Sequence, residues 1–276
     1  MLLGLTALTV LTSCSDEQQF TNQKADAKRI DVQVLNSELA KVRDYVPLYA
    51  VVAHRGSTFW TPEATESAWR WAREMGADYL ESDLQCTKDG VILANHDENL
   101  KRTTNIEDVY SETVPASRIA FYEELGFTHE DALEQYNRDV ASFRPYYAMS
   151  YYYHELLKLD AGSWFNETSL EEARSSFAKQ HQYISALEDQ IAYAKGMRLK
   201  RDNKGERILK PTVKAEYKGM TLKQIYEKIK AKGEYNAKYM DFVEYDFANA
   251  YEQDPQDTKN RPGIYIEFKE SWENPA

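Results

Sequence analysis

Acidic and basic side chains stand within or at the ends of short apolar stretches in this 276-residue sequence. In "YLESDL" the carboxylates of Glu81 and Asp83 are two residues apart, and in "IYIEFK" Glu267 and Lys269 have the same spacing. Because side chains alternate between the two faces of a strand, each pair shares one face. Two carboxylates on one face of an apolar strand are costly to bury, and a divalent cation with oxygen ligands would stabilise them. The spacing therefore indicates a metal site that includes Glu81 and Asp83.

Two histidines end apolar stretches in the same way. "YAVVAHRG" reaches His54, followed by Arg55 and a turn-forming Gly56, and "GVILANHD" reaches His96. Imidazole has an unperturbed pKa of ~6.5 and can carry protons near neutral pH, and an arginine can bind phosphate. The alternative is that each group is a half-exposed side chain without a role. The recurrence of ionisable groups at four strand ends favours chemistry.

The elements that must position these groups follow from hydrophobic periodicity and turn residues. A helix is expected over 61–76, mostly helical, tyrosine-rich chain over 105–197, and an insertion over about 198–258. The insertion should hold a hairpin around Asn203–Gly205 and a helix from Thr221 to Gly233. Strands are expected over 49–54, 77–85, 90–97 and 264–270. Strands with polar C-terminal ends and intervening helices predict an α/β fold that begins like a (β/α)₈ barrel.

Composition excludes some functions. Hydrophobic residues make up 42% of the chain and there are 20 tyrosines, which is typical of a globular protein with a sizeable core. The formal net charge of −11 argues against a nucleic-acid partner. Residues 198–238 are the exception, with 13 Lys and Arg against 5 Asp and Glu. Oligomeric state is not readable from these features.

The first 14 residues, "MLLGLTALTVLTSC", resemble a bacterial lipoprotein signal in which Cys14 is lipidated. The apolar run is too short to span a bilayer, for which about 20 residues are needed. No Lys or Arg precedes it, and a buried first strand is the alternative. Residues 15–46 are then expected to form a tether with a short helix. This pattern predicts a membrane-anchored protein of a bacterial cell envelope, periplasmic or surface-facing, with Cys86 outside any disulfide.

Longer motifs resemble the glycerophosphodiester phosphodiesterases, especially the periplasmic type. They are "HRG", "PEATESA", "GADYLESDLQCTKDGVILANHDENLKRTT", "LKLDAGSWF", "ALEDQI" and "RPGIYIEFKE". The resemblance implies a (β/α)₈ barrel over residues 47–276 that cleaves glycerophosphodiesters to glycerol 3-phosphate and an alcohol.

The resemblance also implies roles for individual residues. His54 and His96 match the acid/base pair, and Arg55 the phosphate-contacting arginine. Lys269 matches a substrate-side lysine, and Glu63 the glutamate of an "ENT" motif that here reads "EAT". The metal ligands, for Ca²⁺ or Mg²⁺, would be Glu81, Asp83 and Glu267.

A complete barrel has eight strands, whereas only four are recognisable here. We therefore expect the N-terminal part of a barrel, open along the strand near 264. Two other functions stay open. One is a non-catalytic lipoprotein that binds glycerophosphate or a surface polymer. The other is a phospholipid-directed phosphodiesterase of the sphingomyelinase D-like type, which the basic insertion would favour on an anionic membrane.

Overall fold

A computed structural model describes residues 49–168, 181–233 and 239–269. The chain divides into two units, Met1–Tyr49 and Ala50–Ala276, and the second contains every element below. The predicted signal, tether and lipidated Cys14 lie outside the described residues. No helix in the described ranges is long and apolar enough to cross a membrane.

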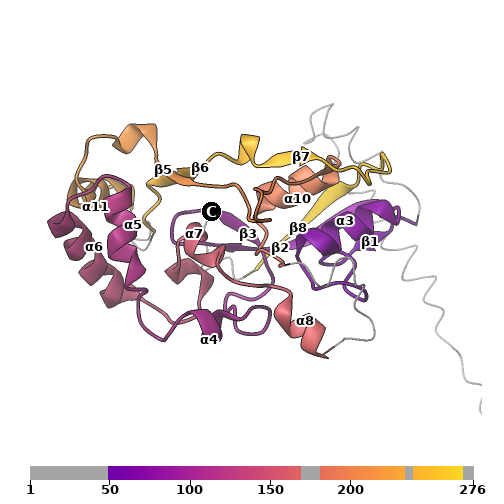
Figure 1. The fold of residues 1–276 in the computed structure, drawn as a ribbon, viewed down its shortest axis with the longest axis horizontal. Coiled ribbons are helices and arrows are strands. Elements are labelled where there is room, and N and C mark those ends of the chain that lie inside the picture. Colours follow the sequence, from indigo (N-terminus) through magenta and orange to yellow (C-terminus); the bar gives the residue numbers. More distant parts are fainter. Residues whose placement is uncertain (1–48, 169–180, 234–238, 270–276) are drawn as a thin grey trace, which may run out of the picture. The chain divides into compact units, whose positions relative to one another are not determined.

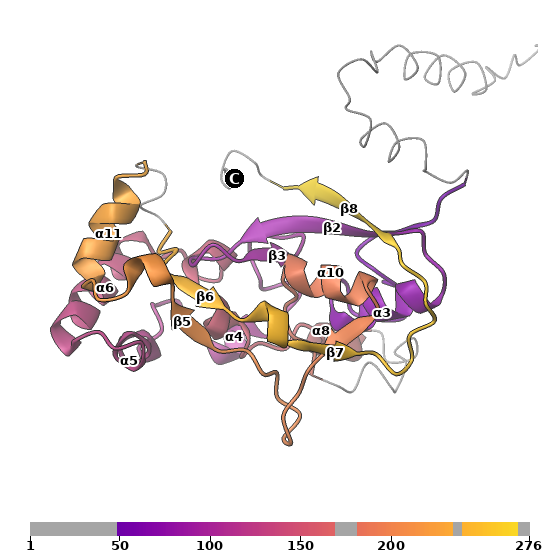
Figure 2. The ribbon, with the colours of Figure 1, turned by 90° about the horizontal axis from the view of Figure 1, so that it is seen from above.

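The centre of the fold is a four-stranded sheet built around β2 (Tyr79–Cys86) (Figures 1 and 2). On one side of β2 lie β1 (Val52–Ala53), which is parallel, and β3 (Ile92–Ala94), which is antiparallel. On the other side β8 (Gly263–Phe268) runs parallel to β2 along six residues. Within the described residues the sheet does not close, and β8 forms its edge as predicted.

The direction of β3 corrects the sequence interpretation, which treated its end like that of a parallel barrel strand. The turn Thr87–Gly90 joins β2 and β3, and a connection this short cannot make a parallel crossover. Thr87 Oγ1 donates to Asp89 Oδ1 at 2.6 Å, which tightens the turn. Because β3 doubles back along β2, it delivers His96 to the middle of the sheet beside Asp83, whose carbonyl accepts from Asn95 N.

Two helices cover the face of the sheet that carries Leu80. They are α3 (Glu66–Glu74) and α10 (Leu187–Ala194), and Figure 2 shows both below β2 and β8. Thr65 caps α3 through its side chain. Trp69 of α3 and Tyr193 of α10 are buried with Leu80 in one cluster. The apolar residues of β2 therefore face the helices, which leaves the carboxylates on the opposite face.

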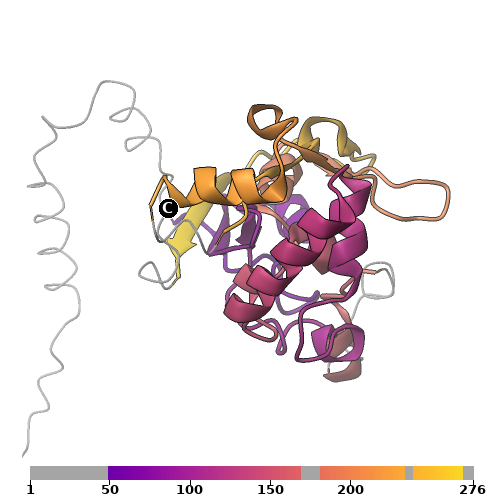
Figure 3. The same cartoon turned by 90° about the vertical axis from the view of Figure 1, so that its left-hand side faces the viewer.

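A second group of helices packs next to β3, whose Leu93 shares a buried cluster with Tyr151 and Tyr153, and Figure 3 shows the magenta and orange members of this group in front. Tyr151, Tyr152 and Tyr153 are fully buried there, so the tyrosine-rich segment packs as a core and not as a lipid-binding patch. The helices are α4 (Ile106–Val109), α5 (Ser117–Glu124), α6 (His129–Ser142), η2 (Ala148–Ser150), α7 (Tyr153–Leu156), α8 (Ser163–Thr168) and α11 (Leu222–Lys230). Thr221 caps α11 as predicted, with its hydroxyl accepting from Gln224 N.

The chain after α10 contains four short strands that periodicity did not reveal. They lie in and around the expected insertion of about residues 198–258: β4 (Met197–Leu199), β5 (Pro211–Val213), β6 (Val243–Tyr245) and β7 (Tyr251–Gln253), with the short 3₁₀ helices η3 (Ala215–Tyr217) and η5 (Phe247–Asn249). β4 pairs with β7 and β5 with β6, both antiparallel. Three residues are too few to show alternation. The predicted hairpin is present as a bridge between Arg201 and Arg207.

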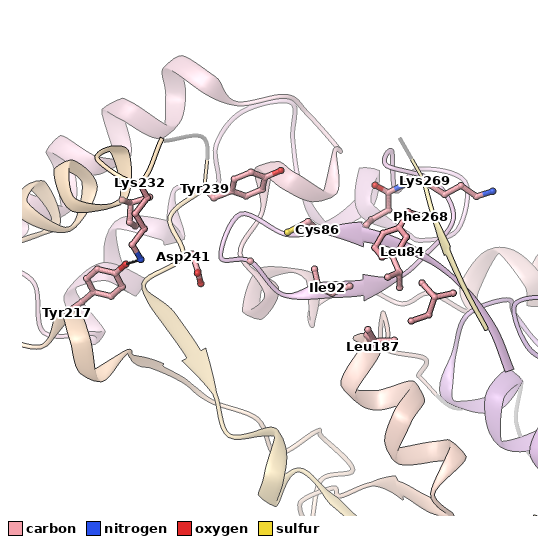
Figure 4. Close-up of a pocket in the computed structure, with 14 residues that line it drawn as sticks. Leu84, Cys86, Ile92, Leu187, Tyr217, Lys232, Tyr239, Asp241, Phe268 and Lys269 are labelled. Carbon is pink, nitrogen blue, oxygen red and sulfur yellow. Dashed lines mark hydrogen bonds between the residues drawn. The ribbon is translucent and has the colours of Figure 1, made fainter. Parts of the chain in front are cut away.

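An apolar hollow of about 510 Å³ lies beside the outer end of β8 (Figure 4). Leu84 and Cys86 of β2 line it with Ile266 and Phe268 of β8, and Phe268 is 68% exposed. Burial raises the pKa of the Cys86 thiol to about 12, so this cysteine is unreactive at neutral pH. An exposed apolar edge strand is a site of association.

We therefore expect the chain to bind a hydrophobic dye and the variant Phe268→Lys to bind less. The lysine removes exposed apolar area from the hollow and places a charge on the strand edge. Dye fluorescence and light scattering measure the effect. Met75→Lys is the control, because Met75 is also exposed but lies at the end of α3. An equal decrease in dye fluorescence in both variants would show that the dye binds scattered surface residues and not the hollow.

Candidate active site

Three carboxylates converge on the face of the sheet opposite the helices. Glu81 and Asp83 are buried, whereas Glu267 is exposed. Asp83 and Glu267 are register partners in the parallel pair β2–β8, so they share a face. One oxygen from each of the three carboxylates lies within 4.8 Å of the others. The predicted convergence is confirmed, and the role of these residues as metal ligands stays a prediction.

The charges of this cluster are only partly offset by hydrogen bonds. Burial raises the pKa of Glu81, and the Asp83 carboxylate adds to the rise against the hydrogen bond from Arg55 N. Glu81 Oε2 accepts that bond at 2.8 Å, while the buried Oε1 has no hydrogen-bond partner among the described residues. A buried carboxylate oxygen without a donor and two further carboxylates in reach fit a hard divalent cation.

Two basic side chains border the cluster, as predicted. Arg55 Nε lies 2.9 Å from Asp83 Oδ2, and Lys269 Nζ lies 3.3 Å from Asp83 Oδ1. Lys269 also pairs with Glu267, which raises the pKa of the ammonium and lowers that of the carboxyl. Arg55 has a left-handed backbone, with φ of 54°, which is uncommon for a residue with a side chain. The backbone at this strand end is therefore held in a conformation that points Arg55 N at Glu81.

Gly56 lies in a turn with φ of +90°, as expected, and it also serves helix packing. A Cβ at Gly56 would lie 2.6 Å from Ala68 Cβ and 2.7–2.8 Å from the Ala68 backbone of α3. The next residue, Ser57, donates its backbone N–H to Ala68 O at 3.1 Å. The "HRG" stretch is therefore fixed to α3 by direct backbone contact, which explains why a glycine follows His54 and Arg55.

We expect Gly56→Ala to lower the free energy of unfolding by about 3 kcal/mol, the sum of overpacking and a left-handed alanine. Gly76→Ala is the matched control, because Gly76 has nearly the same φ, +89° against +90°, and nothing within 4 Å of its Cβ position. It should lose only about 1 kcal/mol. Denaturant unfolding measures both. Equal losses would show that the approach to Ala68 is not the cause.

The two histidines flank the acidic cluster. His54 is exposed, and its charge lowers the pKa of Glu81, although burial raises that pKa more. His96 is about one-third exposed, and its Nδ1 pairs with the Asp97 carboxylate. Gln85 Nε2 donates to His96 O at 3.0 Å and fixes the backbone. His96 and Lys269 line one polar hollow. Both imidazoles are therefore accessible from the face that carries the carboxylates.

Arg102 was missed by the sequence analysis, although it lies in the quoted stretch "HDENLKRTT". Its guanidinium binds both oxygens of Glu63, at 2.7 and 3.1 Å, and Glu63 Oε1 also accepts from Arg55 at 3.2 Å. Burial opposes ionisation of Glu63, but the hydrogen bond and charge of Arg102 and the charge of Arg55 outweigh it, so its pKa is lowered. The described contacts place Glu63 as a support for Arg55.

The remaining histidines lie away from the cluster. His129 is exposed and pairs with Glu123, and His154 stacks on Phe121 with ring centroids 3.7 Å apart. Burial lowers the pKa of His154 to about 3, so it is neutral in the folded protein. His181 packs edge-on against Tyr183. These placements give the three histidines structural or surface roles.

Fold and site define an α/β protein whose acidic centre lies at the carboxyl end of a parallel strand pair, beside two imidazoles. The family model described as "Glycerophosphoryl diester phosphodiesterase family" matches residues 54–247, which is more than half of the chain. The chain therefore belongs to the glycerophosphoryl diester phosphodiesterase family.

Two curated relatives carry the name of this family's enzyme. The chain is 33% identical over 126 residues to a glycerophosphodiester phosphodiesterase of Bacillus subtilis (strain 168), covering 46% of this chain and 30% of the relative. It is 51% identical over 57 residues to one from Caldanaerobacter subterraneus subsp. tengcongensis, covering 21% and 24%. A crystal structure of the Agrobacterium tumefaciens enzyme is 26% identical, with 53% of this chain and 43% of that chain covered and a TM-score of 0.32. The matches thus span less than a third of these two curated relatives.

Proposed function

We propose that the protein hydrolyses glycerophosphodiesters to glycerol 3-phosphate and an alcohol in a metal-dependent reaction. The observation that carries this proposal is the convergence of Glu81, Asp83 and Glu267 within 4.8 Å, with Arg55 and Lys269 at its border. Phosphodiester cleavage requires charge stabilisation on the non-bridging oxygens and proton transfer at the attacking and leaving oxygens. The site offers groups for both tasks.

The metal would be held by Glu81, Asp83 and Glu267, which fit Ca²⁺ or Mg²⁺ because all three offer carboxylate oxygens. When bound, such an ion neutralises negative charge on phosphate oxygens. Arg55 and Lys269 would bind the same phosphate. Each now pairs with Asp83, so both are held at the edge of the acidic cluster.

Proton transfer is assigned to His54 and His96. One imidazole takes the proton of the glycerol hydroxyl next to the phosphate, so that this oxygen attacks phosphorus. The other gives a proton to the alcohol that leaves, and the resulting cyclic phosphate is opened by water with the proton transfers reversed. This is the reaction course that the family resemblance implies. Imidazoles suit both roles because their unperturbed pKa of ~6.5 lies near neutral pH.

The test is turnover of glycerophosphocholine by the full chain, with Ca²⁺, with Mg²⁺ and with a chelator. Equal release of choline and glycerol 3-phosphate that the chelator abolishes is the expected result. Parallel reactions with intact phosphatidylcholine and sphingomyelin separate the phospholipid-directed alternative. Binding of glycerol 3-phosphate without turnover of any substrate would support the non-catalytic alternative and overturn the proposal.

Two further proposals concern the context of the domain. The sheet belongs to a (β/α)₈ barrel, which is supported by the parallel pairing of β2 with β1 and β8 and by the helices α3 and α10 on the face that carries Leu80. The protein is anchored in a bacterial envelope through lipid on Cys14, which is supported by the "LTSC" sequence. Metabolic labelling with a fatty-acid analogue tests the anchor, and Cys14→Ser should lose the label.

A further inference from the structure

A continuous series of ion pairs joins the two strand ends of the site. His96 pairs with Asp97, and Arg102 Nε donates to Asp97 Oδ2. The two terminal nitrogens of Arg102 bind both oxygens of Glu63, and Glu63 Oε1 also accepts from Arg55 Nη1. One guanidinium therefore connects the imidazole after β3 with the arginine after β1. None of these pairs involves a carboxylate of the acidic cluster.

We infer that Arg102 is a positioning residue that fixes His96 and Arg55 at once by holding the carboxylate partner of each. The inference rests on the proposed function for its effect on turnover, but the contacts that carry it do not. Arg102 suits this role because a guanidinium presents five N–H donors in a rigid plane. A lysine has one nitrogen on a flexible stem and cannot hold two carboxylates in a fixed relative position.

The contact with Asp97 sets the proton on His96. Burial opposes ionisation of Asp97, but the hydrogen bonds from Arg102 and His96 outweigh it, so the pKa of Asp97 is lowered. An ionised carboxylate only accepts hydrogen bonds, so His96 Nδ1 must carry the hydrogen. In the neutral imidazole Nε2 then has the free lone pair. Arg102 binds Asp97 Oδ2 and so keeps Oδ1 oriented toward His96 Nδ1, which favours the tautomer in which Nε2 can take a proton.

The contact with Glu63 sets the orientation of Arg55. Arg102 binds both carboxylate oxygens of Glu63, so this carboxylate cannot rotate freely. Arg55 is then held from two sides, by Glu63 and by Asp83. Loss of Arg102 would leave the half-buried carboxylates of Asp97 and Glu63 without their main counterion. The side chains that these carboxylates hold, His96 and Arg55, would then lose their orientation.

The test compares Arg102→Met and Arg102→Lys with the wild type and with the control Lys101→Met. Lys101 is the neighbouring cation, equally exposed, and it pairs with Glu107 outside the series. Ring ¹⁵N NMR of histidine-labelled protein gives the fraction of the Nδ1–H tautomer of His96, with the signal assigned through His96→Gln. Steady-state kinetics with glycerophosphocholine, calorimetric Ca²⁺ titration and thermal melting complete the set.

We expect Arg102→Met to lose the dominant Nδ1–H tautomer and to lower kcat on the order of 10²-fold, as misplacement of a reacting group does. KM should change only a few-fold and Ca²⁺ affinity less than about twofold, and Arg102→Lys should recover less than about a tenth of the lost kcat. Lys101→Met should match the wild type.

Three results would overturn the inference. The first is an unchanged tautomer in folded Arg102→Met. The second is full recovery by lysine, which would show that charge alone matters. The third is a rise in KM that exceeds the loss of kcat, which would make Arg102 a direct phosphate contact. If the wild type turns over none of the substrates, the proposed function fails, while the tautomer measurement still decides the role of Arg102.

Discussion

His96→Ala and His54→Ala are each expected to lower kcat for glycerophosphocholine on the order of 10²–10⁴-fold, the range typical of lost general acid–base catalysis. Each imidazole is accessible beside the acidic cluster, and alanine leaves no group to carry a proton. Metal affinity should change less than about threefold, because neither histidine contributes an oxygen ligand. Turnover measured alongside calorimetric titration with Ca²⁺ and Mg²⁺ gives both quantities.

His129→Ala is the control for these variants, since His129 is exposed on α6 and pairs with Glu123. It should retain full turnover and full metal affinity. If His54→Ala abolishes metal binding, this histidine is a ligand and the acid/base assignment is wrong. If it leaves turnover intact, the histidine is a bystander.

Glu81→Gln is expected to weaken metal binding at least about 10²-fold and to lower turnover with it, because a carboxylate ligand becomes a neutral amide. Without metal, the Glu81→Gln variant should be at least as stable as the metal-free wild type. The pKa of Glu81 is raised, so the folded state disfavours the ionised carboxyl at neutral pH, and the amide removes that charge. The glutamine carbonyl can still accept from Arg55 N, which keeps the backbone contact.

Thermal melting with and without metal, together with titration calorimetry, measures both parts of this prediction. Glu98→Gln is the control, because Glu98 borders the polar hollow outside the acidic cluster. The control should keep the shift in melting temperature that metal causes in the wild type. A full metal-induced shift in Glu81→Gln would exclude Glu81 as a ligand.

Part of the acidic cluster could be predicted because the alternation of side chains along a strand is visible in a single sequence. Alternation along a strand puts Glu81 and Asp83 on one face whatever the strand pairs with. Glu267 followed from the same rule together with the family resemblance. The register that places Glu267 opposite Asp83 depends on a partner strand far away in the chain, so alternation alone could not supply it.

Other features depend on tertiary contacts that leave no local pattern. The direction of β3 could have been read from the length of the Thr87–Gly90 turn, but the requirement at Gly56 arises from the backbone of Ala68, which only the folded chain brings near. Arg102 lies in a polar turn, where an arginine is ordinary, and its partners Glu63 and Asp97 come from separate segments. Three-residue strands such as β4 are likewise fixed by their partners and not by their own sequence.

The pairing of β2 with β8 determines the order in which the site can assemble. Glu81, Asp83 and His96 belong to one hairpin and its flanks, and hairpins form within about 1–10 μs. Glu267 arrives only when β8 pairs with β2, which closes a loop of about 180 residues at roughly 2.5 kcal/mol more than a loop of about 10. The third carboxylate is therefore delivered late. A cation held by these carboxylates would then act after the main folding barrier, and it would slow unfolding more than it speeds folding.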